Sequence, residues 1–277
     1  MKLVCGDRQL DLSTPQVMGI LNATPDSFSD GGQFASLDAA LTHARAMVSD
    51  GASIIDVGGE STRPGATPVS LQEELDRVIP VIEKIRSELN VCISVDSSSP
   101  EVFLQAKIAG AHMLNDVRAL QRDGALEAAK ATGLPVCLMH MQGSPETMQD
   151  NPNYHQIIDD VYDFLSGRIQ ACLDVGITKD NLLVDPGFGF GKTLDDNYRL
   201  LAKLDRFHAL NLPLLIGLSR KSMIAGVLGN PAANERLAGS LAGAVISAMA
   251  GAHIIRVHDV KETADAMKVV AATLQQK

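Results

Sequence analysis

The sequence has no tryptophan, few aromatic residues and no run of lysine and arginine. Its formal net charge of −9 would repel a polyphosphate backbone at long range, and no basic segment offsets that charge. We therefore expect no nucleic-acid partner. A small anionic substrate remains compatible with this charge if a few basic side chains converge where water is excluded.

Cysteine is scarce and scattered. The four cysteines, Cys5, Cys92, Cys137 and Cys172, form no CxxC pair, and the first residues lack the hydrophobic region of a signal peptide. We therefore expect a reducing, cytoplasmic location. Cys92 and Cys137 each lie in an apolar, strand-like run, which predicts that they are small core residues.

One stretch, from Leu237 to Val257, has no charge before Arg256 and is long enough to be compared with a membrane span. It consists mostly of alanine, glycine and serine, whose transfer into lipid gains little free energy. Gly251 followed by isoleucines is typical of a helix end and a buried strand. We expect a packed helix here and no contact with a membrane.

The 277 residues contain eight short, continuous apolar runs, preceded by two strand candidates around Leu3 and Leu10. Such runs are typical of strands that are buried on both faces. They are VMGIL from Val17, SIIDV from Ser53, CISVD from Cys92, MLND from Met113, PVCLMH from Pro135, LLVDP from Leu182, PLLIGL from Pro213 and IIRVH from Ile254.

Segments with helical periodicity lie between these runs, among them residues 36–50, 70–89 and 154–176. Strand followed by helix, eight times over, predicts a (β/α)8 TIM barrel with a short N-terminal β-hairpin. A doubly wound open sheet is the structural alternative. Because no linker rich in Pro, Ser or Gly divides the chain, we interpret residues 1–277 as a single domain.

Nearly every predicted strand ends in a polar residue. In a TIM barrel these ends meet at one face, where active sites are built. For Asp116, and for Asp259 just after the eighth strand, we favour a capping or loop role. The strand-end residues are Asn22, Asp56, Asp96, Asn115, Asp116, His140, Asp185, Ser219, Arg220, Lys221, Arg256 and His258.

Two loops are richer in turn residues than a barrel connection requires: NATPDSFSDGG from Asn22 and GGESTRPGATPVS from Gly58. Such loops usually contact ligands, and their Gly and Pro residues make a mobile flap plausible. The segment DPGFGFGKT from Asp185 resembles phosphate-binding motifs but fails both, since Pro186 and Lys192 occupy glycine positions. We interpret it as a glycine-rich turn that places Phe190 against a flat ligand.

A phosphate site is more credible where Arg256 and His258 leave the last strand, with Arg63 as a further donor. The sequence contains no HExxH, no cysteine cluster and no EF-hand pattern, which argues against a zinc or calcium site. Magnesium needs fewer protein ligands, so Asn22 could suffice together with substrate phosphates. We expect the remaining histidines to be packing or solvated residues: His43, His112, His155, His208 and His253.

In order and spacing, these motifs resemble the dihydropteroate synthases of bacteria. The resemblance covers nearly the whole chain and is carried by NATPDSFSDGG, DVGGESTRPG, SVDS, NDV, DPGFGFGK, GLSRKS and RVHDV. One departure is Ser97, where the family commonly has threonine; a hydroxyl is kept.

The resemblance implies that 6-hydroxymethyl-7,8-dihydropterin diphosphate is condensed with 4-aminobenzoate, with Mg2+ as cofactor, in a homodimer that sulfonamides inhibit. It implies a pterin pocket of Asp96, Asn115, Asp185 and Lys221 supported by Asp56, with Ser219 among the substrate-binding residues. It places the diphosphate and magnesium at Asn22, Arg63, Arg256 and His258, and 4-aminobenzoate at Thr62, Arg63, Pro64, Phe190, Lys221 and Ser222.

The implied chemistry is electrostatic. A carboxylate such as Asp185 can accept two hydrogen bonds from the pterin edge, while Lys221 donates to the pterin oxygen. Catalysis would come from preformed positive charge that meets the departing diphosphate, without a general base. Two alternatives are open: a barrel that transfers a methyl group from a folate to a corrinoid protein, and a catalytically silent pterin-binding paralogue.

Overall fold

Eight parallel strands form a barrel in the structure, a computed structural model that describes residues 1–23, 32–60, 69–144 and 147–276. Neighbouring strands follow the order β8-β7-β6-β5-β4-β3-β10-β9, and a parallel bridge between Val184 and Leu214 closes the ring. The predicted (β/α)8 barrel is confirmed. The strands are β3 (Gln16–Asn22), β4 (Ile54–Gly58), β5 (Cys92–Asp96), β6 (Met113–Asp116), β7 (Val136–Met139), β8 (Leu182–Asp185), β9 (Leu215–Ile216) and β10 (Ile254–Val257).

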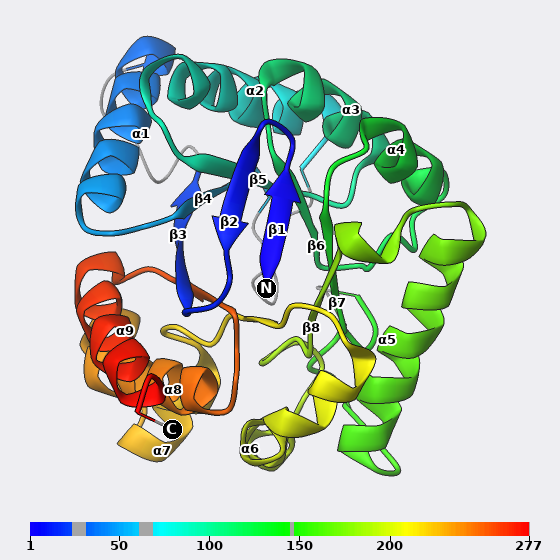
Figure 1. The fold of residues 1–277 in the computed structure, drawn as a ribbon, viewed down its shortest axis with the longest axis vertical. Coiled ribbons are helices and arrows are strands. Elements are labelled where there is room, and N and C mark those ends of the chain that lie inside the picture. Colours follow the sequence, from blue (N-terminus) through cyan, green and yellow to red (C-terminus); the bar gives the residue numbers. More distant parts are fainter. Residues whose placement is uncertain (24–31, 61–68, 145–146, 277) are drawn as a thin grey trace.

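Helices surround these strands (Figure 1). Local sequence sets their ends: α2 starts with a capping box between Ser70 and Glu73, and α3 stops at Gly110, whose φ is 102°. The helices are α1 (Gly32–Ser49), α2 (Leu71–Glu88), α3 (Pro100–Ala109), α4 (Ala125–Thr132), α5 (Ile157–Asp174), α6 (Leu194–Ala202), α7 (Ser222–Leu228), α8 (Leu237–Met249) and α9 (Val260–Leu274).

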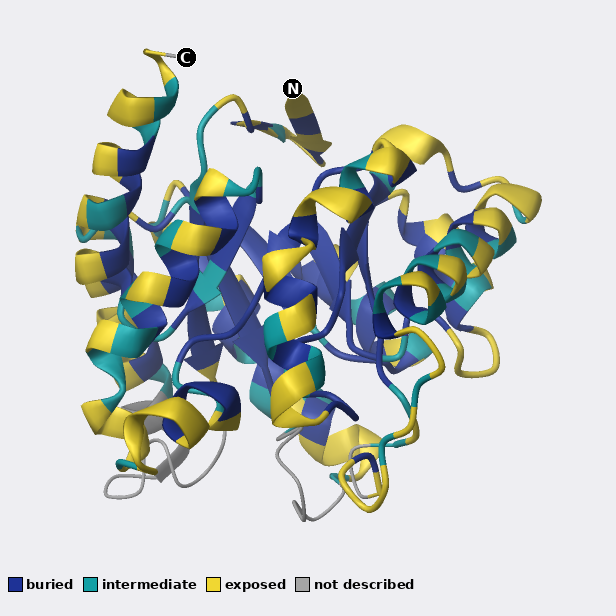
Figure 2. Cartoon of the chain, turned by 90° about the horizontal axis from the view of Figure 1, so that it is seen from below, coloured by how far each residue is buried: buried dark blue, intermediate teal, exposed yellow. Residues whose placement is uncertain are grey.

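The strands are buried on both faces, as their continuous apolar runs require. Ile55 and Ile93 belong to the same buried cluster as Val78 and Ile82 of α2, so the helices cover the outside of the barrel. Figure 2 shows this buried centre inside a ring of helices with exposed outer faces. Because the strand interiors are filled, polar chemistry is confined to the two ends of the barrel.

A hairpin closes the amino-terminal end of the barrel. Its strands, β1 (Lys2–Cys5) and β2 (Arg8–Asp11), pair antiparallel, which confirms the predicted N-terminal hairpin. Its buried residues share one cluster with the first inward-facing residues of the barrel strands. The members are Leu3, Cys5, Leu10, Leu12, Met18, Ile54, Cys92, Met113, Cys137, Leu183, Leu215 and Ile254. The opposite, carboxyl end is therefore the end available to a ligand.

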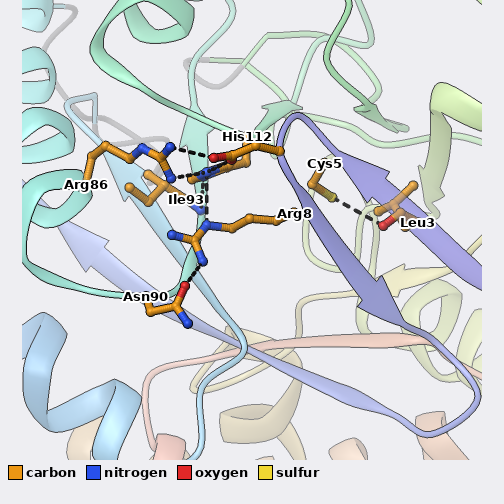
Figure 3. A network of polar contacts seen from close by, with 8 residues as sticks. Leu3, Cys5, Arg8, Arg86, Asn90, Ile93 and His112 are labelled. Atoms are coloured by element: carbon orange, nitrogen blue, oxygen red, sulfur yellow. Dashed lines mark hydrogen bonds and ion pairs between the residues drawn. The ribbon is translucent and has the colours of Figure 1, made fainter.

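A polar network ties this hairpin to the barrel (Figure 3). His112 accepts the Ile93 N–H at Nδ1 (3.0 Å), while its Nε2 lies 3.0 Å from Arg8 Nε and 3.1 Å from Asp7 Oδ1. The Ile93 N–H and the Arg8 Nε–H thus donate to the two ring nitrogens, so His112 joins the hairpin to β5. Burial and the charges of Arg8 and Arg86 lower the pKa of His112 to about 4. This histidine is structural, as expected.

The uncharged stretch from Leu237 forms α8 followed by β10, as predicted. Gly239 and Gly243 let this helix pack closely within the chain: a Cβ at either position would lie 2.5 Å from Ile224 or 2.4 Å from Leu218, respectively. No helix in the described part of the chain is long and apolar enough to cross a membrane. All four cysteines are free and buried.

Candidate active site

Strand register aligns the polar residues at the carboxyl end of the barrel. Asn22 pairs with Gly58, Gly58 with Asp96, and Asp96 with Asn115, so that three polar side chains and one glycine lie side by side at or next to the ends of four adjacent strands. Asp56 lies two residues further inside β4 and is fully buried. The site is therefore built from strand ends held by the sheet, which gives it a rigid base.

Arg256 joins this row from β10, the strand that pairs with β3. Its Nε donates to Asp56 Oδ2 and its Nη2 donates to Asp96 Oδ2, each at 2.6 Å. The Asn115 amide also donates to Asp56 Oδ2, at 3.0 Å. One guanidinium is thus oriented by two carboxylates, and the donors not used by them remain available to an anionic ligand.

Burial shapes the ionisation of this cluster. It raises the pKa of Asp96 to about 7; Arg256 opposes the rise, and the nearby charge of Asp56 adds to it. Burial alone would lower the pKa of Arg256, but the two carboxylates raise it, so its charge is fixed. The cluster consequently presents a permanent positive charge beside a carboxyl that titrates near neutral pH.

Asp185 ends β8 and begins the glycine-rich turn. Its Oδ1 accepts the Gly187 N–H at 2.7 Å, and its pKa is raised by burial against the lowering effect of Lys221. Gly187 has φ 72°, and a Cβ there would lie 1.8 Å from the carbonyl oxygen of His140. Only glycine fits this position, so the turn fixes one carboxylate oxygen and leaves the other for a ligand.

Lys221, at the N-cap of α7, lies within electrostatic range of Asp185. Its Nζ donates to the carbonyl of Phe188 and lies 4.3 Å from the ring centroid of Phe190. Burial lowers the pKa of Lys221 to about 8, while Asp185 opposes that change. Arg220, in left-handed conformation at φ 59°, pairs with Asp259 and so sets the direction of Lys221. Asp259 has the loop role expected of it.

An apolar cluster borders these charges, and apart from Phe190 the sequence reasoning missed its members. Met139 is the register partner of Asp185, and its place at the end of β7 was the signal that could have found it. A flat ring could pack against this cluster while its edge meets Asp185. The cluster comprises Val117, Met139, Met141, Met148 and Phe190.

Ser219 and His258 lie together beside Lys221. The Ser219 hydroxyl is 3.2 Å from His258 Nδ1 and 3.3 Å from the backbone N of His258, which it accepts. Ser222, the first residue of α7, is exposed. These side chains thus border the carboxyl end of the barrel near β10.

Two strand-end residues do not join the site. Asp116 accepts the N–H groups of Arg118 and Leu120 at 2.8 and 2.7 Å, which confirms its loop role. His140 was expected at the mouth, but it is buried behind the glycine-rich turn, 2.8 Å from Lys192 Nζ. That expectation was wrong because the His140 ring packs against Tyr154 and Phe164.

Some predicted site residues cannot be placed. Thr62, Arg63 and Pro64, and most of the two long loops, lie outside the described residues. Asn22 is described and exposed at the end of β3. Within the described ranges, no three His, Cys, Asp or Glu side chains gather as a metal site of that kind would require.

Known proteins resemble this chain over its whole length. The model of the pterin binding enzyme family matches residues 18–258. Dihydropteroate synthase of Escherichia coli K12 is 61% identical, with all of this chain and 98% of that protein aligned; the Haemophilus influenzae protein of the same name is 55% identical, with 99% of both covered.

Solved structures agree with the sequence matches. Dihydropteroate synthase of Yersinia pestis in a sulfonamide drug complex has a TM-score of 0.95 at 57% identity, covering 99% of this chain and 100% of that one. The Xanthomonas albilineans enzyme with 4-aminobenzoic acid has a TM-score of 0.93 at 48% identity, covering 99% and 98%. The chain therefore belongs to the pterin-binding enzymes and, among them, to the dihydropteroate synthases, transferases of folate biosynthesis.

Proposed function

We propose that this chain joins 6-hydroxymethyl-7,8-dihydropterin diphosphate to 4-aminobenzoate, releasing diphosphate and 7,8-dihydropteroate, at the carboxyl end of the barrel. One observation carries the assignment of the site: Arg256 held between Asp56 and Asp96, in the same barrel mouth as Asp185 and Lys221. This arrangement offers acceptors and donors for a pterin edge and a positive charge for a diphosphate.

The pterin is recognised by hydrogen bonds of opposite polarity. Asp185 accepts from the ring N–H and amino group, Lys221 donates to the ring oxygen, and Asn115 does both. Asp96 adds an acceptor, and Asp56 supports the set by orienting Asn115 and Arg256. The apolar cluster around Phe190 packs against the ring face.

The diphosphate lies against Arg256 and His258, with Arg63 as a further donor and Ser219 fixing the His258 ring. Asn22 fits magnesium, because one exposed amide oxygen at a strand end leaves the other coordination positions to water and phosphate. When bound, the magnesium ion neutralises charge on the diphosphate. Sequestered positive charge of this kind stabilises the leaving group as it departs.

In the reaction, the bond between the pterin methylene carbon and the diphosphate oxygen breaks, and its electron pair leaves with diphosphate. The amine nitrogen of 4-aminobenzoate donates its lone pair to the same carbon and then loses one proton to solvent. Lys221 and Phe190 hold this second substrate, together with Ser222, Thr62 and Pro64. No side chain needs to act as a general base, since the attacking amine is neutral.

Sulfonamides would occupy the 4-aminobenzoate position, since the related Yersinia pestis enzyme forms a sulfonamide complex. The identities of 55–61% to proteins named dihydropteroate synthase favour this reaction over the methyl-transfer and silent-paralogue alternatives. Four free, buried thiols are compatible with a reducing cytoplasm.

We also propose a homodimer. Exposed apolar side chains gather on the consecutive helices α7, α8 and α9, which lie side by side in Figure 1. An apolar face of this kind is typical of a subunit interface. The residues are Val227, Leu228, Ile246, Met249 and Val269.

The pterin anchor is tested with Asp185→Asn. A buried hydrogen bond to a charged group contributes about 1.5–3 kcal/mol, so the Kd of the pterin diphosphate should rise about tenfold to a hundredfold. Asp180→Asn, at an exposed position, is the control and should bind as the unmodified chain does. If calorimetry finds that folded Asp185→Asn binds the pterin diphosphate as tightly as the unmodified chain does, the pterin does not bind at Asp185.

A further inference from the structure

Lys192 is a buried cation that the proposed reaction does not use. It is 3% exposed, although it follows a turn at the mouth of the barrel. Its Nζ lies 2.8 Å from His140 Nδ1, 2.8 Å from the Gly187 carbonyl oxygen and 3.0 Å from that of Phe190. The carbonyl of His140 is a more distant neighbour at 3.4 Å.

These contacts favour the charged form of Lys192. Burial lowers its pKa, and burial together with Lys192 lowers the pKa of His140 to about 2, so the imidazole is neutral and Nδ1 is an acceptor. All four neighbours of Nζ are then acceptors. A neutral amine would turn its lone pair towards one of them, whereas the three hydrogens of an ammonium match the three closest. The geometry therefore favours the ammonium form of Lys192 and opposes the effect of burial.

The Lys192 ammonium binds two carbonyl groups of the glycine-rich turn. The turn passes through left-handed conformations at Gly187, Gly189 and Gly191, with φ of 72°, 79° and 63°. These conformations let the carbonyls of residues 187 and 190 point inward to Lys192. The carbonyl of Phe188 turns the other way and accepts from Lys221.

Both halves of the pterin site are attached to that turn. The peptide groups of Gly187 link Lys192 to the anchor: the carbonyl accepts from Lys192, and the N–H holds Asp185 Oδ1 at 2.7 Å. The carbonyl of Phe190 accepts from Lys192, and its ring lies beneath the Lys221 ammonium. A change at Lys192 would thus act on Asp185 and on Phe190 through one residue each.

We propose that Lys192 is a positioning residue for pterin binding: its buried ammonium holds the turn at residues 187–190 so that Asp185 and Phe190 face the ligand. The inference rests on the proposed function, because it assumes that the pterin binds at Asp185. The alternative is a purely structural role, in which loss of Lys192 lowers stability and leaves the affinity of the folded protein unchanged.

Lys192→Met keeps the length of the side chain and removes its charge. Lys203→Met makes the same change at an exposed position and is the matched control. The Kd of the pterin diphosphate, measured by calorimetry without 4-aminobenzoate, should rise at least tenfold in Lys192→Met and stay unchanged in Lys203→Met. Thermal unfolding monitored alongside reports the folded fraction.

The pH dependence of pterin affinity separates positioning from stability. Lys221, Lys192 and Arg256 all face Asp185 and favour its ionised form, and the thiol of Cys137 also lies within electrostatic range. Without the Lys192 charge the pKa of Asp185 rises, so affinity should fall at a higher pH in Lys192→Met than in the unmodified chain. Lys192→Arg keeps the charge and should keep the profile.

If Lys192→Met does not fold, the pterin affinity of Lys192→Arg tests the inference. A planar guanidinium cannot direct three hydrogens from one nitrogen, so folded Lys192→Arg should bind the pterin at least threefold more weakly. Unmodified affinity and pH profile in folded Lys192→Met, or unmodified affinity in Lys192→Arg when Met does not fold, overturn the inference. Absence of pterin binding by the unmodified chain would instead overturn the proposed function, and this inference with it.

Discussion

Arg256 shows how single residues set the electrostatics of the barrel mouth. Asp56 and Asp96 orient its guanidinium before any ligand arrives, so little reorganisation is needed when a diphosphate binds. Removing one partner of such a buried group leaves the other uncompensated and costs several kcal/mol. At the opposite end of the barrel, His112 stays neutral because Arg8 and Arg86 lie beside its ring.

His112 should make stability depend on pH. Its folded-state pKa of about 4 lies below the ordinary value of 6.5, so the unfolded chain takes up the proton first as pH falls. Stability present above pH 6.5 is lost between pH 6.5 and 4, by up to about 3 kcal/mol. Urea unfolding should show a shallower loss in His112→Asn than in the unmodified chain. The exposed His155→Asn should keep the original slope, and equal slopes in all three proteins would contradict this account.

The glycine-rich turn is the element on which the proposed pterin site depends. Its conformation leaves no room for a side chain at Gly187, whereas Gly133, also left-handed at the end of α4, has no neighbouring atom within 4 Å of an added Cβ. The two positions share a backbone conformation and differ in their surroundings. They therefore separate backbone strain from steric collision.

Gly133→Ala should lower the free energy of unfolding by about 1 kcal/mol, the cost of a left-handed alanine. Gly187→Ala adds a collision with a backbone carbonyl, so we expect a loss above about 3 kcal/mol, weaker pterin binding, or both. Denaturant titration and calorimetry measure the two effects. Similar, small losses at both positions would mean that the turn adapts.

Features that depend on neighbouring residues in the sequence were predicted, whereas the orientation of single side chains was not. All eight strands and the hairpin were predicted because apolar runs and glycine punctuation are local features. The convergence of Asp56, Asp96 and Arg256 followed from barrel topology once strand ends were located. The burial of Lys192 and His140 was missed, because a charged residue after a glycine-rich turn gives no sign of which way it faces.

The two ends of the barrel differ in structure and in proposed role. The hairpin and the network around His112 close the amino-terminal end, while the polar strand ends and the glycine-rich turn occupy the other. This polarity lets loops at the carboxyl end vary without loosening the core. The exposed apolar face of α7, α8 and α9 lies on the helices that surround the barrel.

The dimer proposal is tested with a charge on that face. Ile246→Glu on α8 should change the sedimentation coefficient from that of a dimer to that of a monomer, because burying an unpaired carboxylate in the interface costs free energy. Ile108→Glu on α3, also exposed but remote in sequence and on another helix, should stay dimeric. A monomeric unmodified chain at all protein concentrations would contradict the proposal.

The most direct test of the central claim is a stoichiometric turnover assay. Purified protein is mixed with magnesium, 6-hydroxymethyl-7,8-dihydropterin diphosphate and 4-aminobenzoate, and both products are followed together. We predict equal amounts of diphosphate and 7,8-dihydropteroate, with turnover by Asp185→Asn lowered about tenfold to a hundredfold at pterin concentrations below the Kd of the unmodified chain. Pterin binding without either product would contradict the condensation and return the chain to the methyl-transfer or silent-paralogue alternatives.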